Sequence, residues 1–287
     1  QLPRFATHLI AVCLICYDLD LFTQALWLLP IIFILMIGWI NAFNFMDGIN
    51  GITVLYALSA IIAFSLLDVN ESSVPLLVTM GLSCIAFGIF NLRKKAKTFA
   101  GDVGSISMAV FLGYFMIKTI LDTDQIGFIL FFAVYGIDAV ITIAKRLKKK
   151  ENIFEAHRSH LYQYLANEMK YSHLTVAGGY GVTQLILNLG LIYLHSINYL
   201  TLPIIALILV FLTAIYLVLR DRIEKKVVSW SLVIIVLIRV SHYFGSYVLY
   251  YIPDSIKFLN LNYYKRLNLY WLRLIKLTST ATIPNNG

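Results

Sequence analysis

The chain has 287 residues, of which 60% are hydrophobic and 13% are charged, and its mean hydropathy is +0.79. This composition excludes a soluble protein built around one core, because too little polar surface is left to cover it. The formal net charge of +8 does not indicate nucleic-acid binding, because the basic residues gather in particular loops between apolar segments. The sequence therefore predicts an all-α protein that crosses a lipid bilayer several times.

Apolar segments long enough to cross a bilayer as helices follow one another along the chain. We predict eight or nine spans, near residues 5–17, 23–42, 51–67, 74–91, 104–121, 126–144, 174–195, 199–219 and, with a less uniform composition, 227–252. We divide the chain into a transmembrane domain at 1–220 and an extra membrane-associated helix with a basic tail at 221–287. The sequence indicates no role for the second part.

The loops between these spans alternate in charge. Lys and Arg follow the fourth, sixth and eighth spans, at residues 93–97, 145–158 and 220–226. The intervening loops are acidic and carry Asp18, Asp20, Asp68, Glu71, Asp122 and Asp124. Because Lys and Arg are enriched in cytoplasmic loops, we expect all three basic loops, Arg4 and residues 41–51 on the cytoplasmic side.

The stretch between the second and third spans reads NAFNFMDGING over residues 41–51. Asn41, Asn44 and Asn50 supply amides and Asp47 supplies a carboxylate at a membrane surface. The stretch resembles the N-x-x-N-x-x-D-G-I-[DN]-G signature of the polyprenyl-phosphate N-acetylhexosamine-1-phosphate transferases, which start bacterial glycan assembly on a lipid carrier. The resemblance implies nucleotide or catalytic support by Asp47 and hydrogen bonding by the asparagines. Many relatives carry Asp at the position of Asn50.

A second motif, FAGDVGS at residues 99–105, follows the first basic loop and precedes a span. Its glycines permit a tight turn, the Asp102 carboxylate suits a hard cation, and amides at a helix start can face phosphate oxygens together with Ser105. On these residues alone, Asp102 could equally cap a helix that begins near Gly104. The motif is similar to the family's F-x-G-D-x-G-S, which implies that Asp102 binds the metal and that Phe99 stacks on uracil.

Two further polar residues lie in or at the end of predicted spans. Asn91 matches an asparagine on the uracil side of the family pocket, although it stands one residue farther from Asp102 than the family's pattern. Asp138 lies in the sixth span, where an ionisable side chain is costly and usually faces protein or water. The family has an acidic residue near this place, so Asp138 is a candidate site residue, and a structural role for it stays open.

Residues 156–163, between the sixth and seventh spans, read AHRSHLYQ. His157 and His160 are three positions apart and can share one face of a short helix, and Arg158 adds a positive charge. The alternative is a pair of solvated loop histidines. The wording resembles the histidine motif of the branch that initiates O-antigen and capsule synthesis, and it differs from the contiguous histidines of the muramyl-peptide branch, which disfavours peptidoglycan synthesis. The resemblance implies that this loop shapes the nucleotide-sugar site and binds its diphosphate.

The resemblance, which covers residues 1–220, implies a glycosyltransferase family 4 enzyme that moves N-acetylhexosamine-1-phosphate from a UDP-sugar to undecaprenyl phosphate. UMP is released in this first step of O-antigen or other envelope polysaccharide synthesis. The resemblance also implies Mg²⁺ or Mn²⁺ as cofactor and a bacterial inner membrane with the active site facing the cytoplasm. A homodimer and the identity of the N-acetylated sugar stay open. The implied catalytic residues are Asp47, Asp102, His157 and His160, the implied metal ligands are Asp102 and Asp47, and the implied substrate-binding residues are Asn41, Asn44, Asn50, Asn91, Phe99, Ser105 and Arg158.

The front of the chain departs from the family pattern. The family carries an adjacent Asp-Asp pair on an earlier cytoplasmic loop, followed by an L-x-P-R-like stretch. Residues 1–4, QLPR, resemble that following stretch, and no Asp-Asp pair occurs in the 287 residues. We therefore expect that about two N-terminal spans and the paired aspartates are missing, so that the chain is a fragment of a longer enzyme or a decayed one. The alternatives to an active transferase are an inactive remnant and, because Asp138 lies in a span, a membrane transporter.

Overall fold

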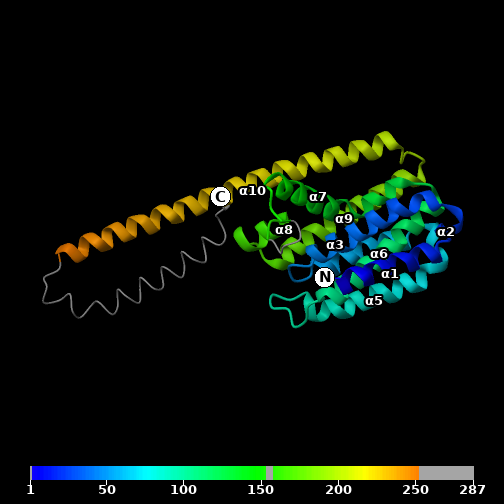
Figure 1. Ribbon diagram of the computed structural model, residues 1–287, viewed down its shortest axis with the longest axis horizontal. Helices are drawn as coiled ribbons and strands as arrows, with labels where there is room; N and C mark the ends of the chain where they lie inside the picture. The colour runs from blue at the N-terminus through cyan, green and yellow to red at the C-terminus, as the bar shows by residue number, and fades with distance from the viewer. Residues whose placement is uncertain (1, 153–157, 252–287) are drawn as a thin grey trace. The chain divides into compact units, whose positions relative to one another are not determined.

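The computed structural model describes residues 2–152 and 158–251, and no strand occurs among them. This confirms the predicted all-α class (Figure 1). The α-helices are α1 Leu2–Asp18, α2 Leu21–Gln24, α3 Leu29–Met46, α4 Ile52–Ser65, α5 Val74–Asn91, α6 Gly101–Thr123, α7 Ala133–Lys148, α8 Leu161–Gln163, α9 His173–Ser196 and α10 Leu202–Tyr251. Shorter helical turns are η1 Leu26–Leu28, η2 Asp68–Ser73, η3 Ile126–Phe132 and η4 Tyr164–Glu168.

Among the described residues, six helical segments are long and apolar enough to cross a membrane. The two remaining early spans of the prediction are helices of lesser length: α1 has 17 residues and α4 has 14. The predicted ninth span, 227–252, is not a separate helix, because α10 continues without a break from Leu202 to Tyr251. The basic residues at 220–226 interrupt the hydropathy but not the helix, and neither Pro nor Gly occurs between residues 204 and 244.

Contacts divide the chain into two compact units, residues 1–227 and 228–287. The first unit thus extends beyond residue 220, where the sequence-based division was placed. It contains the candidate motifs and the part of α10 up to Val227.

The short helix α4 forms the centre of the first unit. It packs against α5, α6 and α9, and α3 packs against α6 and α7. Ten of the 14 residues of α4 are buried, whereas only 6% of the apolar window of Leu202–Val227 is buried. α4 is therefore enclosed by protein, while this part of α10 presents its apolar side chains outward, as expected for a helix that faces lipid.

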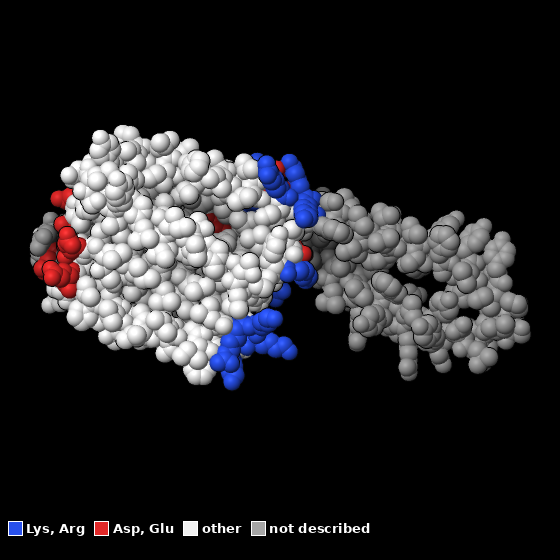
Figure 2. Space-filling model, turned by 180° about the vertical axis from the view of Figure 1, so that it is seen from behind, with Lys and Arg blue, Asp and Glu red and all other residues white. Residues whose placement is uncertain are grey.

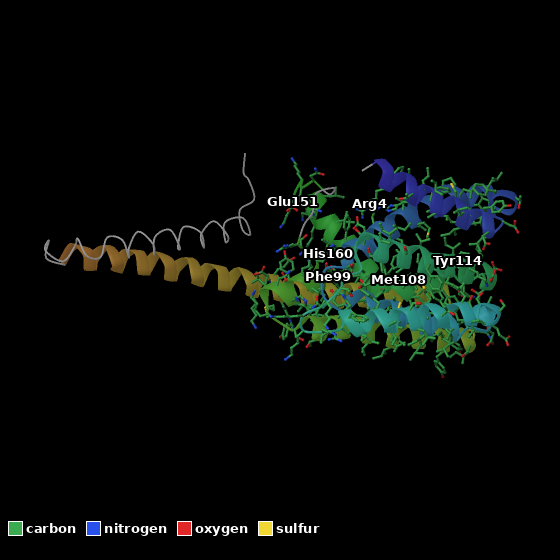
Figure 3. The ribbon with its side chains drawn as sticks, turned by 90° about the horizontal axis from the view of Figure 1, so that it is seen from below. Arg4, Phe99, Met108, Tyr114, Glu151 and His160 are labelled. Atoms are coloured by element: carbon green, nitrogen blue, oxygen red, sulfur yellow. The ribbon has the colours of Figure 1, made fainter. Side chains whose placement is uncertain are left out.

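Charged side chains separate to the two ends of this unit. Figure 2 shows Lys and Arg at one end and Asp and Glu at the other. Figure 3 shows the same polarity for single residues: Arg4, Phe99 and His160 lie toward one end and Tyr114 toward the other. The loops that carry the predicted motifs therefore converge at the basic end of the helix bundle.

Candidate functional site

Asn44, in the last turn of α3, connects three segments that are far apart in the sequence. Its Nδ2 donates to Asp102 Oδ1 at 3.1 Å and to Ser105 Oγ at 2.7 Å, both in the first turns of α6. Its Oδ1 accepts a hydrogen bond from Arg4 Nη2 of α1 at 2.6 Å, and Arg4 Nη1 lies 3.4 Å from Asp102 Oδ2. Asn44 of the first motif is thereby bonded to Asp102 and Ser105 of the second motif. This contact is expected if the two motifs form one site. We call Arg4, Asn44, Asp102 and Ser105 the Asn44 junction.

Asp102 lies at the surface, with 64% of its side chain exposed, whereas Ser105 is fully buried. The helix begins at Gly101 rather than near Gly104, and no side chain caps its start. The Asp102 carboxylate therefore contacts Asn44 and Arg4 instead of serving as a helix cap. Ser105 Oγ donates to the Gly101 carbonyl at 2.7 Å, which stabilises the first turn that presents Asp102.

Asp47 follows α3 directly and stands three residues after Asn44. Its Oδ1 accepts a hydrogen bond from Thr53 Oγ1 at 2.5 Å. Burial raises the pKa of Asp47, the Thr53 hydroxyl lowers it, and the charge of Asp102 raises it further. The two carboxylates thus repel each other, and a cation bound near both would relieve that repulsion.

Gly48 and Gly51, which follow Asp47, have no room for a Cβ atom, and Gly51 also has a backbone conformation that favours glycine. Gly51 has φ +85°, and a Cβ on it would come within 2.5 Å of Leu92 Cδ2. A Cβ on Gly48 would stand 2.1 Å from the hydroxyl of Tyr162. Tyr162 is fully buried and donates to the Phe45 carbonyl at 2.9 Å. The last part of the histidine motif therefore packs directly on the turn that carries Asp47.

Two predicted substrate-binding residues, Asn50 and Asn91, are buried and bonded to backbone. Asn50 Nδ2 donates to the carbonyls of Arg93 at 3.0 Å and Lys94 at 3.4 Å. Asn91 accepts from Gly51 N at 2.7 Å and donates to the Thr98 carbonyl at 2.8 Å. Both side chains hold the first basic loop against the 47–51 turn. Their contact with a ligand stays a prediction.

Three other predicted binding residues have simpler surroundings. Asn41 Nδ2 donates to the Ile37 carbonyl of its own helix at 2.8 Å. Phe99 is 72% exposed and Arg158 is exposed, so both side chains are accessible at the basic end. His157 lies outside the described residues, and its predicted role is not addressed by the structure.

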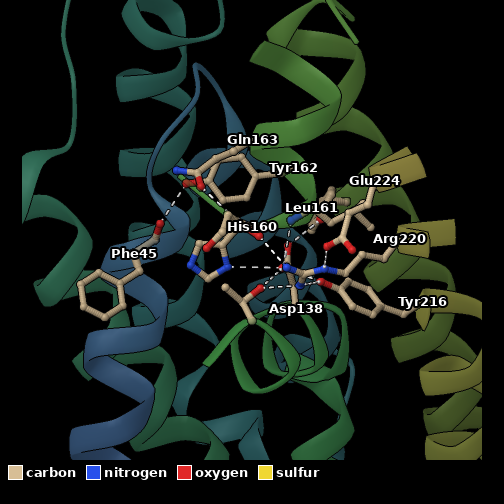
Figure 4. A network of polar contacts seen from close by, with 12 residues as sticks. Phe45, Asp138, His160, Leu161, Tyr162, Gln163, Tyr216, Arg220 and Glu224 are labelled. Atoms are coloured by element: carbon tan, nitrogen blue, oxygen red, sulfur yellow. Dashed lines mark hydrogen bonds and ion pairs between the residues drawn. The ribbon is translucent and has the colours of Figure 1, made fainter. Parts of the chain in front are cut away.

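His160 is almost fully buried and is not a solvated loop histidine. Its Nδ1 lies 3.3 Å from Asp138 Oδ1. The described residues 158–160 are not helical, because α8 begins only at Leu161. The His160 carbonyl accepts hydrogen bonds from the backbone N–H groups of Gln163 and Tyr164. Figure 4 shows His160 directed toward Asp138.

Several contacting residues were missed by sequence reasoning. Arg4 was assigned only to the basic side, and Tyr162 only to the wording of the histidine motif. Arg220 was counted as a loop charge, yet it is a buried residue of α10. A signal was present: Tyr216, Arg220 and Glu224 are four positions apart, so they lie on one face of a helix.

Two carboxylates of the kind that bind a divalent cation lie at the basic end, those of Asp47 and the exposed Asp102. Among the described residues, no group of three or more His, Cys, Asp or Glu side chains forms a metal site. Two carboxylates are nevertheless enough for Mg²⁺, which proteins commonly bind through one or two carboxylates, water and substrate phosphates.

Part of the chain is similar in sequence to known proteins. Residues 4–120 match glycosyl transferase family 4. The chain is 35% identical over 82 residues to the phospho-N-acetylmuramoyl-pentapeptide-transferase of Streptococcus suis, covering 28% of this chain and 24% of that protein. It is 30% identical over 136 residues to that of Streptococcus uberis, covering 45% and 40%. It is 33% identical over 112 residues to that of Lactococcus lactis subsp. cremoris, covering 38% of this chain and 33% of that protein.

The chain spans less than half the length of each of these relatives. The matched residues run from α1 almost to the end of α6 and include the whole Asn44 junction and Asp47. The histidine segment, residues 157–163, and α10 lie outside them. Residues 4–120 of this integral membrane protein are therefore similar to glycosyl transferase family 4.

Proposed function

We propose that the intact protein transfers N-acetylhexosamine-1-phosphate from a UDP-sugar to undecaprenyl phosphate and releases UMP. The observation that carries this proposal is the Asn44 junction, which brings a carboxylate, a guanidinium, an amide and a hydroxyl together beside Asp47 at the basic end. Both substrates are polyanions, so a site for them needs positive charge and directed hydrogen-bond donors.

The proposed reaction is a displacement at phosphorus. An oxygen of the lipid phosphate attacks the sugar-linked phosphorus of the UDP-sugar, a new P–O–P bond forms, and the bond to the UMP oxygen breaks. The attacking phosphate is already largely ionised near neutral pH, so positioning and charge stabilisation carry more of the catalysis than proton removal. Arg4 supplies positive charge next to Asp102, and the exposed Phe99 and Arg158 are available to the donor.

Asp47 and Asp102 would hold Mg²⁺ or Mn²⁺. A bound divalent cation neutralises diphosphate oxygens and stabilises charge as it develops on the leaving group. The position of Asp47 three residues after Asn44, whose amide bonds to the exposed Asp102 carboxylate, supports this assignment. Asn44 keeps Asp102 oriented through its Nδ2, and Thr53 does the same for Asp47.

The site would face the cytoplasm of a bacterial cell and lie in its inner membrane. This orientation rests on the positive charge that gathers at the end of the bundle where the motifs lie (Figure 2). A nucleotide sugar would then arrive from the aqueous side, while the lipid carrier would reach the same end through the membrane.

Two pathways are distinguished by the donor. The HRSHLYQ wording of residues 157–163 favours an O-antigen-type donor such as UDP-GlcNAc. The relatives named above favour transfer of a phospho-N-acetylmuramoyl-pentapeptide as the second candidate. The family match ends at residue 120, before this segment, so the match does not decide between the two candidates.

The test is a donor panel with the intact protein in detergent or nanodiscs. UMP release is followed with undecaprenyl phosphate and Mg²⁺ present, using UDP-GlcNAc in one reaction and UDP-N-acetylmuramoyl-pentapeptide in the other. Release that requires the lipid phosphate supports the proposal, and the preferred donor decides the pathway. If neither donor yields UMP above the level of an Asp102→Asn variant, the proposed function is wrong.

A further inference from the structure

Asp138 of α7 is fully buried within a membrane-spanning segment and accepts several hydrogen bonds. Its Oδ1 accepts from Tyr216 Oη of α10 at 2.8 Å and from the Leu161 backbone N–H at 3.1 Å, and lies 3.3 Å from His160 Nδ1. Its Oδ2 accepts from Tyr180 Oη of α9 at 2.8 Å. The carboxylate therefore connects the transmembrane helices α9 and α10 with His160 and Leu161 of the histidine segment (Figure 4).

Arg220 of α10 holds the same segment from a second direction. Its Nη2 donates to the Ser159 carbonyl at 2.7 Å, and its Nη1 donates to Tyr216 Oη at 2.7 Å and to Thr142 Oγ1 at 2.6 Å. Glu224, one turn later, accepts from Arg220 Nε at 2.8 Å. Only 2% of Arg220 is exposed, so its donors are directed into protein rather than toward phosphate groups in solution.

The anchored segment leads directly to the turn of the candidate site. Leu161 is held by Asp138, and the next residue, Tyr162, donates to the Phe45 carbonyl and packs on Gly48. Asp47 lies between Phe45 and Gly48 in the sequence. A displacement of residues 159–161 would therefore be transmitted through one buried aromatic ring to the backbone on both sides of Asp47.

We propose that Tyr216 and Arg220 of α10 are positioning residues, which fix residues 159–162 and through Tyr162 fix the Asp47 turn in its reactive geometry. This inference rests on the proposed function for its catalytic part. Ionisable groups inside a membrane segment are costly, and a buried charged network is weak evidence for stability alone. Here both charged side chains, Asp138 and Arg220, bind the backbone of the segment, which is the arrangement that orientation requires.

The first test measures local backbone protection and needs no activity. Hydrogen–deuterium exchange is compared in the intact wild-type protein and the Arg220→Gln, Tyr216→Phe and Arg222→Gln variants. Arg222→Gln is the matched control, because it makes the same change at a position of the same helix that is not buried. We expect exchange of amides 160–164 to rise about tenfold in Arg220→Gln and Tyr216→Phe, with α4 unchanged and the control equal to wild type.

The second test separates positioning from simple loss of folded protein. The kcat of Arg220→Gln, calculated per folded molecule, should fall about tenfold to a hundredfold with little change in KM. Tyr162→Phe should lower kcat much less in the Arg220→Gln background than in the wild-type protein. Additive effects, an unchanged exchange at 160–164, or an equal loss of protection in all helices would overturn the proposal.

If Arg220→Gln does not fold, Tyr216→Phe decides, since it removes a single hydroxyl. The exchange experiment also keeps the two proposals apart. Wild-type protein without UMP release would refute the proposed function, and the exchange of amides 160–164 would still decide whether Tyr216 and Arg220 position the segment.

Discussion

Gly48→Ala tests the contact between the histidine segment and the Asp47 turn. The new Cβ would stand 2.1 Å from Tyr162 Oη, where ordinary van der Waals contact begins at 3.4 Å, so the hydroxyl must withdraw by about 1.3 Å. Tyr162 is fully buried and would lose its hydrogen bond to the Phe45 carbonyl. Overpacking costs about 1–3 kcal/mol and the lost bond about 1 kcal/mol, so we expect a loss of roughly 2–4 kcal/mol in unfolding free energy.

The assay is denaturant unfolding in detergent micelles, combined with UMP release. Gly38→Ala on the preceding helix α3 is the control, because nothing lies within 4 Å of a Cβ there, and it should be neutral or stabilising by up to about 1 kcal/mol. In a Tyr162→Phe background the nearest hydroxyl is gone and the ring carbons stand at 3.0 Å, so Gly48→Ala should then cost only about 1 kcal/mol. Equal effects of Gly48→Ala and Gly38→Ala, or the same cost in both backgrounds, would refute this reasoning.

Three further predictions concern the site. Asp102→Asn should abolish UMP release, whereas Asp122→Asn at the acidic end should leave it intact; a kinetic assay of both variants checks this, and retained activity in Asp102→Asn would rule out the metal role. Asn91→Ala leaves the Gly51 N–H and the Thr98 carbonyl without this partner, so unfolding free energy should fall by about 1–3 kcal/mol, compared with almost no change for the exposed Ser83→Ala. Burial raises the pKa of Asp47 in the folded protein above its value of about 3.9 in the unfolded chain. Protonation of Asp47 therefore adds to the free energy of unfolding fully below about pH 3.9, and this contribution is lost as the pH rises through the folded-state pKa. In EDTA at neutral pH, Asp47→Asn should therefore melt at a higher temperature than wild type and yet be inactive, and a lower melting temperature would contradict this assignment.

Much of the architecture could be predicted from hydropathy and charge. Apolar segments marked the helices, and the alternation of basic and acidic loops predicted that the motifs share one end. Asn44 bonds to Asp102, and Figure 3 shows Phe99 and His160 toward the same end. The number of spans was harder to predict. α4 is enclosed by neighbouring helices and needs only 14 residues, and the charged turn at 220–226 does not end a helix that has no Pro or Gly there.

The roles of individual polar side chains could be predicted less well, because they depend on partners distant in sequence. Asn50 and Asn91 have their donors bonded to backbone carbonyls of the loop 93–98, and no local pattern reveals such a pairing. Asp138 was expected to face protein or water, and its environment is protein from three helices and the histidine segment. Arg220 lies within a cluster of basic residues, and only its spacing of four positions from Tyr216 and Glu224 distinguishes it from its neighbours in the sequence.

The proposed reaction transfers a phospho-sugar rather than a sugar alone. The direct measurement uses UDP-GlcNAc, or the muramoyl-pentapeptide donor if the panel prefers it, labelled with ³²P at the phosphorus attached to the sugar, together with undecaprenyl phosphate and the intact protein. We predict that the label moves into the lipid fraction while unlabelled UMP appears in equal amount. Label that stays in the aqueous phase as UDP, while sugar enters the lipid, would mean that the bond between sugar and phosphate is broken instead, and would contradict the account.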